Sequence, residues 1–182
     1  MKLIYVANIR LPTEKAHGVH IMKMCETFAN ANADVELVVP RRLNPIKDDP
    51  FDYYKVRRNF RIKRLPCLDL VRFGKLGFWV QALSFAEAVV WYVFFKKGAI
   101  FYSRDELPIF YLSNLGRRVV WEAHMGQTNW FARQLIQRKI PMVVITEGLK
   151  KLYGSLGEGP GEMLIAPDAV DTSQFSVSIS KE

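Results

Sequence analysis

The chain has 182 residues, of which 49% are hydrophobic and 24% are charged, with 11 glycines and 9 prolines. This composition excludes a disordered or fibrous chain and can supply one sizeable hydrophobic core. The 26 Lys and Arg residues against 18 Asp and Glu give a formal net charge of +8 at pH 7, which predicts attraction to an anionic partner such as phosphate groups, nucleic acid or an acidic lipid surface.

The amino-terminal run KLIYVAN is compact and apolar, which predicts a buried parallel strand. It lacks the long apolar core and the small-residue cleavage site of a signal peptide. After a loop over residues 9–18, apolar residues recur at helical spacing from Ile21 to Ala29, which predicts a helix.

The two cysteines, Cys25 and Cys67, have neither metal-ligand spacing nor the density of a disulfide framework. Cys25 falls on the apolar face of the first predicted helix, so we expect a core thiol. A reducing, cytoplasmic setting fits this usage best.

DVELVVP at residues 34–40 predicts a second strand, and the polar segment 41–60 predicts a long surface excursion. RIKRLPCL at residues 61–68 predicts a third, more peripheral strand. The basic run from Lys55 to Arg64 has two interpretations: a site for phosphates or anionic headgroups, or a solvated strand edge. Aromatic residues are not interleaved with these charges, so we expect no nucleic-acid partner.

The segment LGFWVQALSFAEAVVWYVFF, residues 76–95, has about the length of a membrane span and is flanked by lysines. Gln81, Ser84 and Glu87 fall three residues apart on one expected stripe. Glu87 near the middle of a bilayer would cost about 2.5–3.5 kcal/mol. Three interpretations follow: a membrane span, a helix lying on a membrane surface, and a mostly buried crossover helix over 76–97, which we favour.

The rest of the chain alternates between predicted strands and helices. The strands are expected at 99–105, 117–124, 141–147 and 162–171, and the helices at 106–116, 130–139 and 148–157. Residues 172–182 have no pattern. This alternation predicts an α/β fold of three layers, Rossmann-like, with a mostly parallel sheet and helices on both faces.

Polar residues gather at the carboxyl ends of the predicted strands, where ligands bind in such sheets. In chain order these ends carry Asn8, Pro40, Pro66, Arg104, Asp105, Glu122, His124, Thr146, Glu147 and Asp168. We therefore expect His124 at the rim of a cleft, the alternative being a histidine hydrogen-bonded in a loop.

The loop before the first helix offers a second candidate site. It contains Lys15, His17, Gly18 and His20. A glycine at a helix start lets backbone amides approach an anion, but an ordinary strand-to-helix loop explains the segment equally well. The G-x-G-x-x-G and G-x-x-x-x-G-K-[ST] motifs are absent, which argues against an NAD-dependent oxidoreductase. With three histidines in the chain and Glu14 as the nearby acid, we expect no metal site.

Several segments together resemble family 4 glycosyltransferases, which consist of two Rossmann-like domains in the GT-B arrangement. They are KLIYVANIRLPTEKAHGVHIMKMCETFA, RIKRLP, IFYSRD, VVWEAH, VVITEGLKKLY and LIAPDAVDTSQF. The resemblance implies an amino-terminal, acceptor-side domain over 1–167 and an interdomain hinge over 168–182. It also implies that the donor-binding carboxy-terminal domain is missing from this chain.

The resemblance also implies roles for individual residues. His124 would be the catalytic residue near the transferred sugar, and Gly18 would face the donor phosphates. Arg104 and Glu122 would line the acceptor side. His17 stands where the family often has a glycine, which alters the approach to phosphate. Thr146 with Glu147 would cap the following helix, and Asp168 with Ala169 replace the usual Asn and Gly of the hinge.

The implied function is transfer of a sugar, with retention of configuration, from a nucleotide-sugar donor to an acceptor. The acceptor class stays open among a polysaccharide, a lipid-linked glycan and a small glycan. We expect no cofactor and no metal, an isolated domain without activity, and a cytoplasmic location with possible contact at an anionic membrane face. The alternative from a different class is a non-catalytic Rossmann-like module that binds an anionic ligand or a partner.

Overall fold

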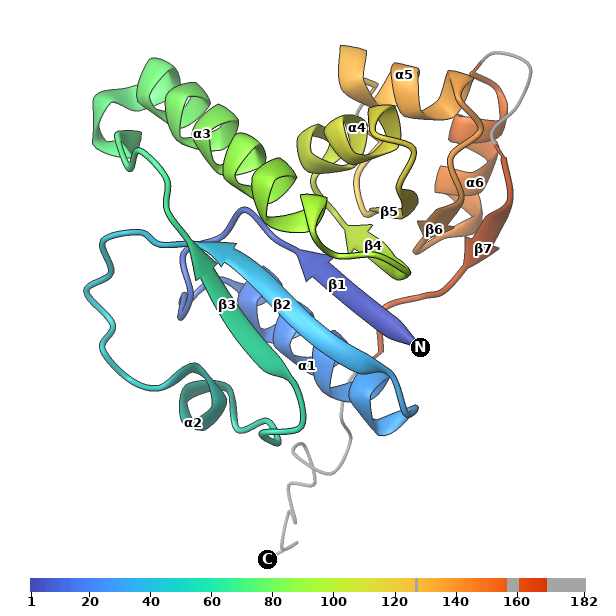
Figure 1. Ribbon diagram of the computed structural model, residues 1–182. Helices are drawn as coiled ribbons and strands as arrows, with labels where there is room; N and C mark the ends of the chain where they lie inside the picture. Colours follow the sequence, from blue (N-terminus) through green and yellow to red (C-terminus); the bar gives the residue numbers. More distant parts are fainter. Residues whose placement is uncertain (127, 157–160, 170–182) are drawn as a thin grey trace, which may run out of the picture.

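The computed structural model describes residues 1–126, 128–156 and 161–169 of the chain. These residues form a seven-stranded sheet covered by helices (Figure 1). The strands are β1 (Lys2–Val6), β2 (Asp34–Pro40), β3 (Arg61–Leu65), β4 (Ala99–Ser103), β5 (Arg118–Ala123), β6 (Met142–Val144) and β7 (Met163–Ile165).

The strand order is β3-β2-β1-β4-β5-β6-β7, and every neighbouring pair is parallel. The order reverses between β1 and β4, which are adjacent although β2 and β3 separate them in sequence. The predicted α/β, Rossmann-like fold is therefore confirmed, and β3 lies at the sheet edge as the peripheral strand.

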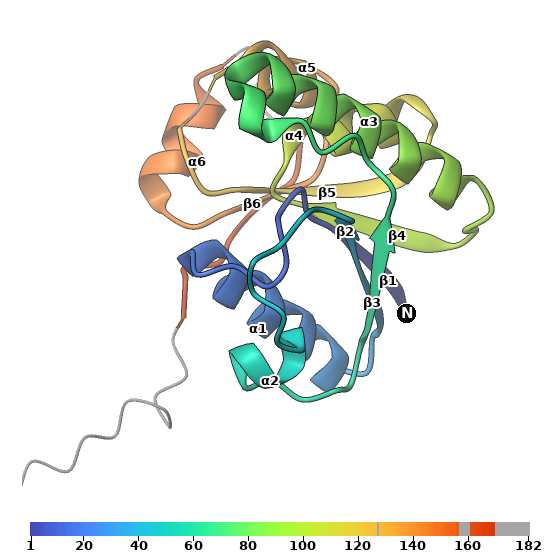
Figure 2. The ribbon, with the colours of Figure 1, turned by 90° about the vertical axis from the view of Figure 1, so that its left-hand side faces the viewer.

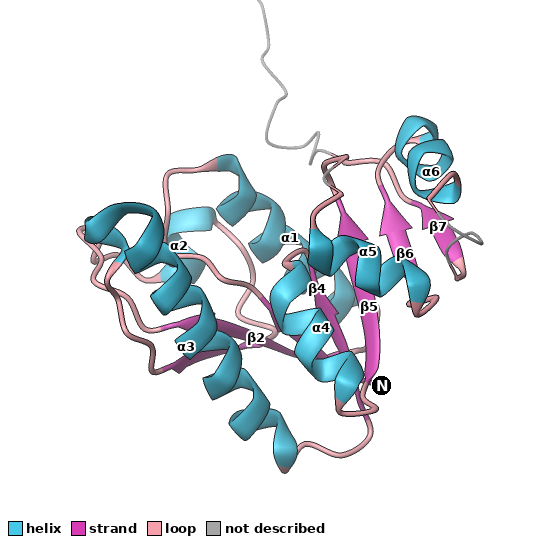
Figure 3. Cartoon of the chain, turned by 90° about the horizontal axis from the view of Figure 1, so that it is seen from above, coloured by secondary structure: helices cyan, strands magenta, loops and turns pink. Residues whose placement is uncertain are grey.

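Helices cover both faces of the sheet (Figure 2). They are α1 (Ala16–Asn30), α2 (Pro50–Tyr54), α3 (Gly74–Phe94), α4 (Glu106–Asn114), α5 (Trp130–Gln137) and α6 (Glu147–Gly154), with a 3₁₀ turn η1 at Val71–Phe73. Ile21, Cys25 and Tyr54 place α1 and α2 in one core. Phe85 and Leu135 belong to the opposite core, where α3, α4 and α5 lie side by side (Figure 3).

One predicted boundary was wrong, and one predicted surface segment contains an additional short helix. Helix α1 begins at Ala16, so Gly18 lies in its first turn and not in the preceding loop. The surface excursion 41–60 contains helix α2 because Asp49 accepts a hydrogen bond from the Phe51 amide and Pro50 occupies the first helical position.

Helix α3 connects β3 to β4, which confirms the crossover position. The prediction of a mostly buried helix was wrong, since 39% of its most apolar window is buried. Together with the preceding turn, the stretch Val71–Phe94 is long and apolar enough to cross a membrane by length and composition. The expected polar stripe is also absent: Gln81 is fully buried and donates to Asn8 Oδ1 at 2.8 Å, whereas Glu87 is exposed.

Two arginines of the basic run beside β3 pair with nearby carboxylates. Arg58 pairs with Asp49 at 3.0 Å and Asp52 at 2.9 Å, and Arg61 pairs with Asp34 at 2.7 Å. These contacts favour the solvated strand edge over the phosphate site.

Candidate functional site

Two histidines and a glutamate meet at the carboxyl end of β5. Glu122 is buried, and its Oε1 lies 3.0 Å from Nε2 of His20, which α1 supplies. Nε2 of His124, just after β5, contacts the same oxygen. The cluster therefore joins two segments that are far apart in the sequence.

Two tyrosines of neighbouring strands complete the surroundings of Glu122. The Tyr5 hydroxyl donates to Glu122 Oε2 at 3.2 Å, and the Tyr102 phenol on neighbouring β4 lies near enough to feel the charge of the carboxylate. Burial, followed by the charge of Glu122, raises the pKa of both phenols. Both tyrosines therefore stay protonated donors, and both carboxylate oxygens are satisfied in the core.

Glu122 is held as a carboxylate. Burial acts to raise its pKa, but the hydrogen bonds from His124 and His20, together with their charges, lower it well below the usual value. A carboxylate only accepts hydrogen bonds, so both Nε2 atoms must be the donors. Each imidazole, when neutral, then carries its lone pair on Nδ1.

The Nδ1 atoms of both histidines lie near one further carboxylate. Asp168 Oδ1 is 3.4 Å from Nδ1 of His20 and 3.8 Å from Nδ1 of His124. The Asp168 side chain is about half exposed. A substrate hydroxyl that approaches either Nδ1 would therefore take the place of Asp168.

A pocket of about 400 Å³ adjoins the cluster at the switch between β1 and β4. It is lined by Ala7, Asn8, Ile9, His17, Ile21, Phe78, Arg104, Asp105, Glu106, Trp121, Ala123, His124 and Met125. The Asn8 amide donates to Asp105 Oδ2 at 2.7 Å, and burial raises the pKa of both Asp105 and Glu106. Polar strand ends thus gather at one edge of the sheet, as the sequence predicted.

Four of the five predicted site residues lie in or beside this pocket. His124, His17 and Arg104 line it, and Glu122 is joined to His124. Burial, then the charges of Lys15 and Arg104, lowers the pKa of His17. Thr146 caps α6 by accepting from the Leu149 amide at 3.1 Å, in agreement with its expected role.

Gly18 is placed differently, because it is buried outside the pocket lining. Its amide donates to the Lys15 carbonyl at 2.9 Å. A Cβ at this position would overlap the Tyr54 hydroxyl and lie 2.6 Å from Thr13 Cγ2. Close packing of the first turn of α1 against Tyr54 therefore accounts for this glycine.

Sequence reasoning assigned no catalytic part to His20. The signal that identifies it is its position in the first turns of α1, directly after the central strand β1. The direction of the His20 side chain depends on how α1 packs on the sheet.

His20, Glu122 and His124 could also hold a metal ion. Each offers one ligand atom, and the three atoms lie within 4.8 Å of one another. Two imidazoles and a carboxylate are common donors to zinc and other transition metals. The same atoms also satisfy one another directly by hydrogen bonds, so the geometry permits either use.

No protein-family model and no curated protein matches this sequence. Among solved structures, sucrose-phosphate synthase from Thermosynechococcus elongatus has a TM-score of 0.65 and 12% identity, over 96% of this chain and 93% of that one. Apo UGT2 of Phytolacca americana has a TM-score of 0.61 and 8% identity, over 96% of this chain and 53% of that one. A UDP-glucosyltransferase from Polygonum tinctorium has a TM-score of 0.57 and 9% identity, over 100% of this chain and 55% of that one.

These structural neighbours are GT-B glycosyltransferases. At such low identities the likeness establishes the shared fold. The chain spans about half the length of the two plant proteins.

Proposed function

We propose that this chain is the acceptor-side domain of a GT-B glycosyltransferase that moves a sugar from a nucleotide-sugar donor to an acceptor hydroxyl. The observation that carries the proposal is the contact of His20 and His124 with buried Glu122 beside the pocket. The neighbouring folds support it, since one such structure is described as complexed with UDP-glucose.

The cluster suits general base catalysis. The acceptor hydroxyl would give its proton to Nδ1 of a neutral imidazole while its oxygen bonds to the anomeric carbon. The bond from that carbon to the phosphate oxygen breaks, and the nucleotide leaves with the electron pair. Glu122 would stabilise the imidazolium, and such positioned bases contribute about 10²–10⁴-fold in rate.

The stereochemical course has two candidates. The family 4 resemblance implies retention. A base for the acceptor hydroxyl instead serves a single direct displacement, which inverts the anomeric carbon, and the geometry of the cluster favours this course. The anomeric proton coupling of the product, measured by NMR, distinguishes the two.

The donor side is proposed to lie in a second domain that follows a hinge over 168–182, of which 170–182 fall outside the described residues. The isolated domain is then expected to be inactive. We propose that the reaction needs neither cofactor nor metal and takes place in the cytoplasm, in keeping with the two free cysteines, Cys25 and Cys67.

The test is turnover by the complete two-domain protein, measured as release of nucleoside diphosphate from a panel of nucleotide sugars. We expect acceptor-dependent release that is lost in the His20→Ala/His124→Ala double variant and kept in Glu36→Gln, because Glu36 lies outside the pocket lining. Release that is unchanged in the double variant would overturn the site assignment. Nucleotide-sugar binding without release in any acceptor mixture would favour the non-catalytic module.

A further inference from the structure

The outward face of α3 is an exposed apolar stripe. Leu76, Trp79 and Leu83 lie at helical spacing on its first half, and Trp91 and Phe94 on its second half. The exposed Glu87 occupies the position between the two groups on the same face. Between 44% and 77% of the surface of each of the five apolar residues is exposed. We call these five residues the outer stripe. It extends over about 27 Å at the helical rise per residue, which makes it a large apolar surface for a folded domain.

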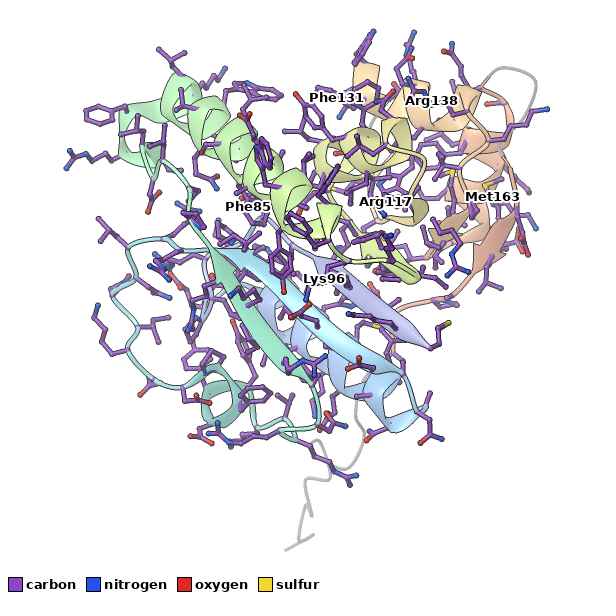
Figure 4. The ribbon with its side chains drawn as sticks, in the orientation of Figure 1. Phe85, Lys96, Arg117, Phe131, Arg138 and Met163 are labelled. Atoms are coloured by element: carbon purple, nitrogen blue, oxygen red, sulfur yellow. The ribbon has the colours of Figure 1, made fainter. Side chains whose placement is uncertain are left out.

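The opposite face of α3 holds the helix firmly on the sheet. Phe85 points toward the sheet (Figure 4) and, with Val89 and Val93, is buried in the core. The Tyr92 hydroxyl donates to Glu36 Oε1 at 2.8 Å. Crossing a bilayer would break these contacts, so α3 can lie on an apolar surface but cannot span one without unfolding.

Basic residues stand at both ends of the outer stripe. Arg72 and Lys75 are exposed at its start, and Lys97 is exposed at its end. Lys96 is engaged otherwise, since its Nζ lies 3.4 Å from Glu36 Oε2. Glu87 is the single acidic residue between positions 72 and 97. The surface therefore combines apolar and aromatic side chains with a positive rim.

We propose that the outer stripe docks this chain onto a bilayer that contains anionic lipids, with α3 lying in the plane of the interface. Trp and Phe side chains are favoured at the boundary between headgroups and acyl chains, and flanking Lys and Arg attract anionic headgroups. A second copy of the chain fits less well, because two such faces would bring basic rims together on molecules that each carry +8.

Docking by α3 also bears on the acceptor. Phe78, from the first turns of the same helix, lines the pocket that contains His124. A docked chain would hold this pocket near the membrane surface, where a lipid-linked acceptor presents its glycan. This step rests on the proposed function, whereas the docking surface itself does not.

The experiment is flotation of the purified 182-residue chain with vesicles of phosphatidylcholine, with and without phosphatidylglycerol. We expect binding to the anionic vesicles, and this binding should weaken as salt is added. Replacing one basic residue of the rim should lower the affinity about fivefold. Leu76→Ser/Trp91→Ser should weaken binding at least about tenfold. The control is Leu164→Ser on β7, where Leu164 is 62% exposed while neighbouring Met163 and Ile165 pack against the core that contains Phe85. This variant should bind as the unchanged chain does.

Glu87 tests whether charge contributes to vesicle binding, because its negative charge should oppose attraction to anionic lipids. Removing its charge should strengthen binding to anionic vesicles several-fold, so Glu87→Gln should bind more tightly than the unchanged chain. Failure to float with anionic vesicles, or equal losses in Leu164→Ser and Leu76→Ser/Trp91→Ser, would overturn the proposal. So would a dimer that Leu76→Ser/Trp91→Ser converts to a monomer, which would assign the stripe to a second copy. Vesicle binding with no transfer to lipid-linked acceptors would leave the docking surface standing and remove the acceptor assignment.

Discussion

The imidazole rings of His20 and His124 meet edge to face, with 4.9 Å between their centroids and 84° between their planes. One ring comes from α1 and the other from the end of β5, and both point Nε2 at the same oxygen of Glu122. Glu122 therefore links two histidines from separate elements, and a change at any one of the three side chains alters the contacts of the other two.

If the proposed function holds, replacing Glu122 by glutamine should lower turnover of the proposed two-domain enzyme by about 10²–10⁴-fold, because the neutral amide no longer stabilises an imidazolium. The free energy of unfolding should fall by about 1.5–3 kcal/mol, since hydrogen bonds to a buried charge are lost. Glu36→Gln is the control: Glu36 is also buried and bonded, by Tyr92, but it lies outside the pocket lining. Equal loss of turnover in both variants would show a purely structural role for Glu122.

The two histidines of the cluster should behave as a unit. We expect His20→Ala and His124→Ala each to reduce turnover strongly, and the double variant to be little worse than the more damaged single variant. His17 lines the same pocket but makes no described contact with Glu122, so His17→Ala should lower the rate less than either cluster variant does. Strictly multiplicative losses in the double variant would contradict a shared role.

Metal removal separates the two uses open to the cluster. If the histidines, hydrogen-bonded to Glu122, act as bases toward the acceptor hydroxyl, treatment with EDTA followed by gel filtration should leave turnover unchanged. Mass spectrometry of the metal content should then find far less than one ion per chain. Activity that is lost on chelation and restored by zinc would assign His20, Glu122 and His124 as metal ligands.

Part of the site was predictable from local sequence. The run VVWEAH ends a buried strand, and ligands bind beyond the carboxyl ends of parallel strands, so Glu122 and His124 were expected near a cleft. His20 was not given a catalytic part, because its direction depends on how α1 rotates when Ile21 and Cys25 pack on the sheet. Rotation about a helix axis is a tertiary property, and the sequence pattern defines only the apolar face.

The fold itself followed from the alternation of strands and helices, whereas the burial of α3 did not. This helix is apolar all round, so its sequence contrasts the two faces too little to predict which one meets the sheet. The choice depends on Gln81 reaching Asn8 and on Phe85 entering the core. Both contacts join segments that are distant in sequence.

The lowered pKa of Glu122 predicts a pH dependence of stability. The unfolded carboxyl takes up a proton near its usual pKa of about 4.3, while the folded one stays ionised to lower pH. The stabilisation that ionised Glu122 gives the folded chain is therefore complete above the unfolded pKa, and it is lost as pH falls toward the folded pKa. Urea unfolding of the unchanged chain and of Glu122→Gln should differ most at neutral pH and converge in acid. A constant difference across the pH range would contradict the shift.

The last prediction concerns Gly18, for which packing and phosphate binding give different results. The Tyr54 hydroxyl accepts from the Thr13 amide and donates to the Thr13 carbonyl, each at 2.7 Å, so it cannot move aside for a new Cβ. Gly18→Ala should therefore lower the free energy of unfolding by about 1–3 kcal/mol. Gly154→Ala is the control, because a Cβ there has no heavy atom within 4 Å, and it should be neutral or stabilising by about 0.4–1 kcal/mol.

Two measurements decide between the roles. They are urea unfolding of the two glycine variants and, in the proposed two-domain enzyme, the KM for the proposed nucleotide-sugar donor. The packing role predicts a lower unfolding midpoint for Gly18→Ala with little change in KM. A raised KM at unchanged stability would instead return Gly18 to the phosphate-facing role that the family resemblance implies, and would mean that α1 sits farther from Tyr54 when the donor is bound.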